Sequence, residues 1–371
     1  MNLELNEQQE MLQKSARDFL MNRVSKKLIR DMEIDSKGFT LELWQQMAQL
    51  GWQGLVFPEK YGGMNFGFLD LVVLLEEMGR FCLPGPFFST VVLGGLLIME
   101  AGNDEQKAEY IPKIANGELI ATLAMLEVNG SYNPALVETN AVAEDGAYVI
   151  SGTKLYVTDA NVADVIIVVS KTPGGITLFI VDAKSSGIKV IPLNTIAGDK
   201  QCEVLFDKVK VVQKNILGGL NNGSAILEKF IQKAAIAKCG EMVGGFQQMF
   251  EMTLYYAKTR TAFGKPIGTF QAIQHYCANM AIDLDSSRFM TYKAAWMFTE
   301  DIPCAKLVSA TKAWVSEAYR RATFIAHQIH GSIGFTMDYD LQLYTRRARG
   351  GEMLLGTPQF HREIVMHELG L

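Results

Sequence analysis

The sequence has few cysteines and few histidines, and neither residue type is grouped. The five cysteines are scattered over 371 residues, and no pair has a metal-ligand or redox spacing. We therefore expect reduced thiols, no disulfide and a cytoplasmic protein. His327 and His330 are three residues apart, but no third ligand accompanies them. The sequence thus predicts no metal site.

Two further features are missing, a strong charge excess and a long apolar run. The formal net charge is −5 and no basic stretch could follow a phosphate backbone, which excludes a nucleic-acid partner. The longest apolar stretch, near Val91 to Met99, is too short for a bilayer, so we expect no membrane insertion. The acidic, polar N-terminus resembles neither a signal nor a transit peptide.

Apolar residues are abundant. They make up 49% of the chain against 20% charged residues, which is typical of a well-packed globular protein. A chain of this length predicts two or three domains, or one core with appended layers.

The periodicity of apolar residues divides the chain into three segments. Residues 1–120 have helical spacing, with Asn6 as the N-cap of the first helix and Pro84 opening a buried fourth helix. Residues 121–217 alternate in short segments such as AYVISGTKLYVTD and ITLFIVDA, which predicts an antiparallel β-domain. Residues 218–371 return to long helical runs, which predict a four-helix bundle. The predicted fold class is α+β.

Five local strings, spread in order over nearly the whole chain, resemble those of the acyl-CoA dehydrogenase family. They are AGNDEQKAEYIPKIANGE, ISGTKLYVTDANVADVIIVV, KTRTAFGKPIGTFQAIQH, AHQIHGSIGFT and MLLGTPQFHREIVMHEL. The resemblance implies helices, a β-domain and a helical bundle in that order. It also implies bound FAD, an acyl-CoA substrate and an electron-transferring flavoprotein as partner. A homotetramer, or a heterotetramer with a paralogue, is the implied assembly.

The resemblance assigns cofactor residues by position. The segment from Leu123 to Leu126, with Met125 and Leu126 at its end, would edge the flavin ring. Tyr156 would cover the ring in place of the usual Trp, and Thr158 would bond near N5. Other positions would reach the cofactor of a neighbouring subunit or follow the catalytic loop: Arg260, Phe263, Gln271, Gln328, Ile329, Gly331, Thr357 and Gln359. No GxGxxG follows a predicted strand, so we expect no transfer of electrons to a nicotinamide.

The carboxylate that most family members use as catalytic base is missing. Family chemistry needs a positioned carboxylate to remove the proton beside the thioester carbonyl. MLLGT places Leu355 at the usual glutamate, and leucine cannot accept a proton. Some relatives carry the base on the first bundle helix, where this chain has Ala234 and Ala235.

Glu241 is the candidate that replaces the base. It follows Ala234 by two helical turns on the same face, within the apolar string GEMVGG. An unused, unpaired carboxylate there would be costly, although a structural bond to a neighbouring helix would also explain it. Glu352, three residues before Leu355, is a weaker candidate, and Glu251 is expected to be solvated or at a subunit contact.

The resemblance places the acyl tail along the buried fourth helix. Phe87, Phe88 and Thr90 would line it together with Leu355, and two glycines that follow would open space. Aromatic rings beside small residues would suit a cyclic, branched or steroid-like acyl group. Plain core packing is the alternative.

Three functions remain open. The first is an acyl-CoA dehydrogenase with a displaced base. The second is a non-catalytic subunit that binds FAD and acyl-CoA in a mixed oligomer, and the third is a flavoprotein with other redox chemistry. The ending RRARGGEMLLG carries Arg347 where family members often carry Asp. This ending resembles a bacterial branch of the family in which two different chains build one active site. Turnover by the single chain would favour the first function, and a gene neighbour encoding a longer paralogue with an intact carboxylate would favour the second.

Overall fold

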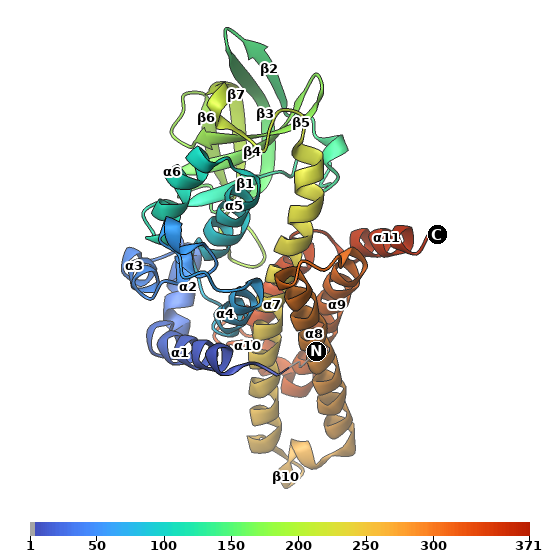
Figure 1. Cartoon of the computed structure of the whole chain (residues 1–371). Coiled ribbons are helices and arrows are strands. Elements are labelled where there is room, and N and C mark those ends of the chain that lie inside the picture. Colours follow the sequence, from blue (N-terminus) through green and yellow to red (C-terminus); the bar gives the residue numbers. More distant parts are fainter. Residues whose placement is uncertain (1–3) are drawn as a thin grey trace. The chain divides into compact units, whose positions relative to one another are not determined.

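The computed structural model describes residues 4–371, which form two compact units (Figure 1). The helical unit contains residues 4–29, Gly67–Leu83 and Ala235–Leu371. The sheet unit contains Arg30–Phe66 and Pro84–Ala234. Each unit is assembled from separated stretches of chain, whereas periodicity divides the chain only along its length. The predicted division after residues 120 and 217 therefore stays a prediction.

An eight-stranded sheet is the framework of the sheet unit. Its neighbours follow the order β6-β7-β3-β2-β4-β5-β8, and β1 pairs with β4 beside this path. The strands are β1 (Ala121–Ala124), β2 (Asn140–Glu144), β3 (Ala147–Thr158), β4 (Val165–Thr172), β5 (Gly175–Asp182), β6 (Ile188–Leu193), β7 (Gln201–Val212) and β8 (Ile216–Leu217).

The sheet is mixed: most neighbouring strands are antiparallel, as predicted, but two pairs are parallel. β1 runs parallel to β4, with Ala121 opposite Val165 and Ala124 opposite Val168. β2 also meets β4 in parallel, at Asn140. A tight turn joins only antiparallel neighbours, and the whole β2–β3 hairpin separates β1 from β4. Alternation reveals the buried face of a strand but not its direction.

One face of the sheet carries the core of this unit. Phe179, Phe206, Ile150 and Val204 are fully buried there, and each such side chain contributes about 1.5–3 kcal/mol of transfer free energy. The pairing of β3 with β7 shifts register between Lys154 and Val157. That irregularity is a β-bulge, a feature that redirects side chains, and it lies where the flavin was expected.

The predicted buried fourth helix exists, but most of it is a π-helix. This is η3 (Phe88–Leu96), followed by α5 (Leu97–Ala101). A Cβ on Gly94 would lie 2.4 Å from the Cβ of Ala121, so glycine lets η3 approach β1 closely. Most remaining helices of the unit are short: α3 (Leu41–Gln49), η1 (Trp52–Gly54), η2 (Glu59–Tyr61), α6 (Asp104–Ala115), η4 (Pro134–Leu136) and η5 (Gln213–Asn215). α2 (Lys26–Ile34) crosses the boundary between the units.

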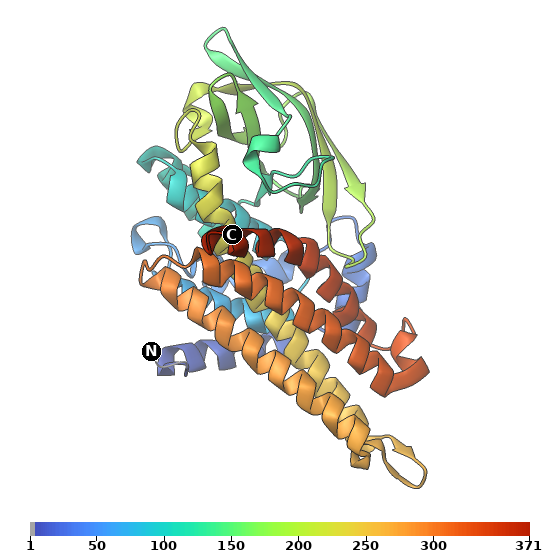
Figure 2. The same cartoon turned by 90° about the vertical axis from the view of Figure 1, so that its right-hand side faces the viewer.

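Long helices dominate the helical unit, as predicted. Asn6 caps α1 and forms a capping box with Gln9, which confirms the predicted N-cap. Figure 2 shows α8 and α9, coloured orange, side by side. The helices are α1 (Glu7–Arg23), α4 (Phe68–Arg80), α7 (Gly223–Thr259, in this unit from Ala235), α8 (Gln271–Thr299), α9 (Ala305–His330), α10 (Leu341–Met353) and α11 (Pro358–Glu368). The sequence did not predict α10, because three arginines and two glycines obscure its apolar face.

Helices α4 and α7 touch through glycines. A Cβ on Gly79 would lie 1.8 Å from the carbonyl oxygen of Glu241, and one on Gly244 would lie 1.7 Å from that of Glu76. No side chain fits in either place, so the two backbones are in direct contact. This contact fixes the stretch of α7 that carries Glu241.

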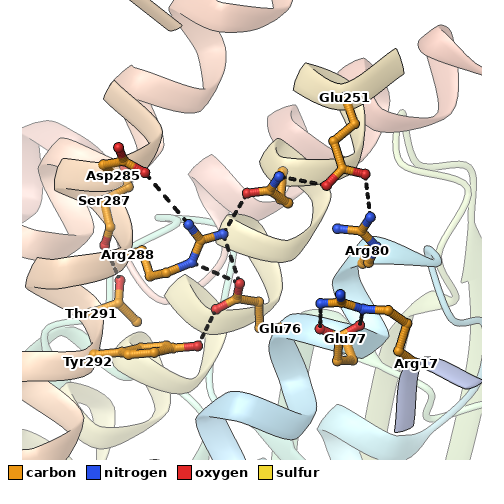
Figure 3. A network of polar contacts seen from close by, with 11 residues as sticks. Arg17, Glu76, Glu77, Arg80, Glu251, Asp285, Ser287, Arg288, Thr291 and Tyr292 are labelled. Carbon is orange, nitrogen blue, oxygen red and sulfur yellow. Dashed lines mark hydrogen bonds and ion pairs between the residues drawn. The ribbon is translucent and has the colours of Figure 1, made fainter. Parts of the chain in front are cut away.

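Buried ion pairs surround the same crossing (Figure 3). The carboxylate of Glu76 accepts hydrogen bonds from Arg288 at 3.0 Å and from Tyr292 at 2.8 Å. Glu77 pairs with Arg17 at 2.6 Å. Buried carboxylates need such partners, because an unpaired charge in the interior is costly. Among residues 4–371, no helix is both long and apolar enough to cross a membrane.

Candidate active site

The segment after β1 is held by bonds from β3. The Leu155 N–H donates to the Leu126 carbonyl at 2.8 Å, and Lys154 Nζ donates to the Met125 carbonyl at 3.1 Å. Within the described chain, the N–H groups of Leu126 and Glu127 donate to no protein acceptor. The carbonyls of Met125 and Leu126 are thus fixed, while the N–H groups of Leu126 and Glu127 remain available to a ligand. A flavin ring needs such donors at N1 and O2, so the segment fits FAD.

A buried ion pair stabilises this segment. Lys154 is fully buried and its Nζ lies 2.8 Å from Glu127 Oε1. Glu127 also accepts the N–H groups of Glu138 at 2.7 Å and Thr139 at 2.9 Å. Burial lowers the pKa of Lys154 to about 8, against the opposing effect of Glu127. Burial alone would raise the pKa of Glu127, but its hydrogen bond and charge interaction with Lys154 outweigh this and lower it.

Tyr156 lies in the bulge of β3. Its φ of +54° is left-handed, which costs about 1–2 kcal/mol for a residue other than glycine. The side chain is 51% exposed. Thr122 donates its hydroxyl to the Thr158 carbonyl at 2.6 Å, which ties β1 to the end of β3. The structure therefore brings Met125, Leu126, Tyr156 and Thr158 together, as the resemblance implies.

The candidate acyl-tail helix η3 is hydrogen-bonded to the residue that follows β3. Ser89 donates to Asp159 Oδ2 at 2.6 Å, and Asp159 directly follows Thr158. Phe87, Phe88 and Thr90 are all buried. The Thr90 hydroxyl has no hydrogen-bond partner in the described chain. π-Helices are rare and occur often at functional sites.

Most other cofactor candidates lie exposed in the helical unit. Arg260 directly follows α7, and Phe263 lies in a short hairpin with its side chain 95% exposed. Gln328 and Gly331 are exposed at the end of α9. Gln271 begins α8 and is exposed, Ile329 is buried, Thr357 caps α11 and Gln359 is exposed in its first turn.

The position of the usual base is well ordered although it carries leucine. Leu355 is buried and has a φ of +61°. The loop around it receives hydrogen bonds from Lys312 on α9 and His361 on α11. Sequence reasoning missed both residues. A lone lysine in the apolar string VSATKAWV of a buried helix face was the available signal.

Glu241 is present on α7 but is already paired. Its carboxylate lies 2.6 Å from Lys238 Nζ, one turn earlier on the same helix, and its side chain is 24% exposed. Besides the larger effect of burial, its negative charge raises the pKa values of the Cys82 thiol and the Tyr319 hydroxyl. The carboxylate is therefore partly buried and close to both groups.

The other two carboxylates are held by arginines. Glu352 lies 3.2 Å from Arg349 and 3.6 Å from Arg320. Glu251, expected to be solvated or at a subunit contact, pairs with Arg80 within this chain and accepts a hydrogen bond from Gln247.

Three family models match the chain in order. They are the acyl-CoA dehydrogenase N-terminal domain at residues 6–118, the middle domain at residues 122–209 and the C-terminal domain at residues 221–370. The probable acyl-CoA dehydrogenase YngJ of Bacillus subtilis is 29% identical, with 100% of each chain covered.

Solved structures agree with these matches. Butyryl-CoA dehydrogenase from Megasphaera elsdenii has a TM-score of 0.92 and 26% identity, and the match covers 100% of both chains. A chain of the ChsE4-ChsE5 complex from Mycobacterium tuberculosis has a TM-score of 0.93 and 25% identity, over 100% of this chain and 99% of that one.

Proposed function

Because the chain belongs to the acyl-CoA dehydrogenase family of FAD-dependent oxidoreductases, we propose that it oxidises an acyl-CoA to an enoyl-CoA. Its electrons would pass to an electron-transferring flavoprotein. The open amide donors of Leu126 and Glu127, beside Tyr156, carry this proposal, because they suit a flavin edge. Bound FAD supplies the hydride acceptor. The chain's own residues hold its ring, exclude water and take up the substrate proton.

Glu241 is our proposed base. It lies on the helix where the resemblance places the base of some relatives, and its carboxylate pairs with Lys238 at 2.6 Å. Glu352 is less suited, because two arginines, Arg349 and Arg320, hold its carboxylate in place.

The substitution Glu241→Gln tests this role, with Glu352→Gln as a matched control. We expect Glu241→Gln to slow anaerobic flavin reduction by about 10²-fold or more while FAD content and thioester binding are kept. Glu352→Gln should reduce its flavin at close to the wild-type rate. If Glu241→Gln also bleaches at the wild-type rate, Glu241 is a structural residue.

We further propose a cyclic, branched or steroid-like acyl group as the substrate tail. Phe87 and Phe88 offer aromatic walls. Gly94 and Gly95 do not open the expected space, because Ala121 and Phe57 fill the places beside them. A panel of straight, branched and ring-bearing acyl-CoAs, mixed anaerobically with the yellow protein, tests the class. Faster bleaching by straight-chain members than by branched or cyclic members would contradict it.

A second candidate function is a non-catalytic subunit that binds FAD and acyl-CoA beside a paralogue. The losses at Leu355, Ala234 and Ala235 favour it, and one similar chain comes from a complex of two different proteins. Exposed Phe263 and Gln328 support an assembly, either a homotetramer or a heterotetramer. Light scattering with and without the paralogue separates these, and a stable FAD-loaded monomer would contradict both. The scattered cysteines support a cytoplasmic location.

A further inference from the structure

The α10–α11 loop (residues 354–357) is fixed by two buried side chains from neighbouring helices. Lys312 Nζ donates to the carbonyls of Gly351 at 3.0 Å, Glu352 at 3.2 Å and Gly356 at 3.1 Å. It also donates to Ser316 Oγ at 3.1 Å. The last carbonyls of a helix have no partner within the helix. Lys312 therefore satisfies the C-terminal end of α10, where a positive charge is also favoured by the helix dipole.

His361 holds the remaining carbonyl. Its Nε2 lies 2.9 Å from the Leu355 carbonyl, which can only accept, so Nε2 carries the proton. Nδ1 then accepts from Ser309 Oγ at 3.3 Å. Burial, with the charge of Lys312, lowers the pKa of His361 to about 4. The ring is thus neutral at pH 7, in the tautomer that this bond needs.

Within the described part of the chain, Lys312 has no carboxylate partner. It is fully buried, and no carboxylate of residues 4–371 lies within ion-pair distance of it. Burial lowers the pKa of its ammonium to about 8. A buried charge compensated only by carbonyls and a hydroxyl is expensive, and a methionine of similar length would avoid that cost. Its presence therefore requires a reason other than stability.

The conformation of the loop supplies that reason. Leu355 has a φ of +61° and Gly356 a φ of +104°. A Cβ on Gly356 would lie 2.5 Å from the Phe360 ring and 2.8 Å from His361 Nε2. A left-handed leucine persists only where its surroundings impose it. Lys312 and His361 impose it here, through the four carbonyls around the turn.

We propose that Lys312 and His361 are positioning residues that form a loop clamp and so direct the side chain at position 355. The clamp is independent of the chemistry of residue 355, so it persists although that residue is leucine. A carboxylate introduced there would be presented in a defined direction. The consequence for catalysis rests on the proposed function, whereas the clamp itself does not.

Hydrogen exchange of the FAD-loaded protein, read by mass spectrometry, tests the clamp. The Leu354 N–H donates to the Gly350 carbonyl at 3.1 Å, so it should be protected in the wild type. We expect Lys312→Met to speed exchange at residues 354–356 by about tenfold or more. Lys306→Met, the same change at an exposed site on α9, is the matched control and should leave the loop unchanged. Equal exchange in the two variants would overturn the proposal.

A second variant decides the question if Lys312→Met does not fold. His361→Phe keeps an aromatic ring in place and removes the bonds of His361 to the Leu355 carbonyl and to Ser309 Oγ. It should also speed loop exchange, by several-fold, and loop exchange at the wild-type rate would overturn the clamp.

The rate of flavin reduction provides a separate test of the loop clamp. In the Glu241→Gln background, which lacks the proposed base, Leu355→Glu should speed anaerobic flavin reduction by about 10²-fold or more with the acyl-CoA that bleaches the wild type fastest. Adding His361→Phe should remove most of that gain while leaving the affinity for this acyl-CoA, measured from the flavin spectrum, unchanged. A full gain that survives His361→Phe would contradict the positioning role. Absence of any gain, with the loop still protected, would count against the proposed function rather than the clamp.

Discussion

Lys154 in the sheet unit and Lys312 in the helical unit are both fully buried, and burial lowers the pKa of each to about 8. Their compensation differs. Lys154 pairs with the Glu127 carboxylate, whereas Lys312 is met by three carbonyls and a hydroxyl. Both hold main chain at a candidate site, one beside the expected flavin ring and the other around Leu355.

This difference in compensation predicts how each site responds to the loss of its lysine. Removing the lysine from a buried ion pair leaves an unpaired carboxylate, which is strongly destabilising. Removing a lysine that meets only carbonyls leaves dipoles, which tolerate the loss better. The flavin segment is thus expected to fail as a whole, and the Leu355 loop to loosen locally.

The largest expected effect is that of Lys154→Met. It leaves Glu127 charged and buried, so we expect a loss of about 3–5 kcal/mol in the free energy of unfolding and a loss of bound FAD. Urea unfolding and the absorbance of the bound flavin measure the two effects. The double variant Lys154→Met with Glu127→Gln should recover much of the stability. If Lys154→Met were as stable as Lys312→Met, the proposed difference between the two lysines would be contradicted.

Acid should weaken the Leu355 loop through His361. Its folded pKa of about 4 lies below its ordinary value near 6.5, so only the unfolded state gains a proton between these limits. The contribution of His361 is therefore full above pH 6.5 and falls as the pH drops, by about 2 kcal/mol at pH 5. Urea unfolding at pH 7 and pH 5 measures it. His361→Phe should lose less stability than the wild type over this range, and an equal loss would contradict the assignment.

The smallest effect on global stability is expected for Lys312→Met. It leaves three carbonyls without their donor but also removes a buried charge, so the net change should be within about 1–2 kcal/mol. Thermal unfolding measures this, with Lys306→Met as the exposed control. A loss as large as that of Lys154→Met would show that the two lysines are equivalent after all.

The sequence predicted local elements better than the pairing of strands that are distant in sequence. Strands such as Ile188–Leu193 and the N-cap Asn6 follow from local pattern, and the structure confirms them. The parallel pairing of β1 with β4 depends on contacts distant in sequence, so alternation could not reveal it. The assignment of Met125 to the edge of the flavin ring and of Tyr156 as its cover came from the resemblance and stays a prediction.

The Leu355 loop was harder to predict. A base is recognised by its residue type, and leucine gives no signal of a retained loop conformation. Lys312 and His361 belong to different helices, and only the fold shows that both bind the same turn. The pairing of Glu241 with Lys238 could have been anticipated from their spacing of three residues.

The central claim is that this single chain is an FAD-dependent dehydrogenase whose base is a carboxylate outside position 355. Anaerobic stopped-flow mixing of the purified FAD-loaded chain with a panel of acyl-CoAs tests it most directly. The account predicts that at least one thioester bleaches the flavin of the wild type, and that Glu241→Gln slows this by about 10²-fold or more. A folded, FAD-loaded chain that binds acyl-CoAs yet is bleached by none, unless its paralogue is added, would contradict the claim.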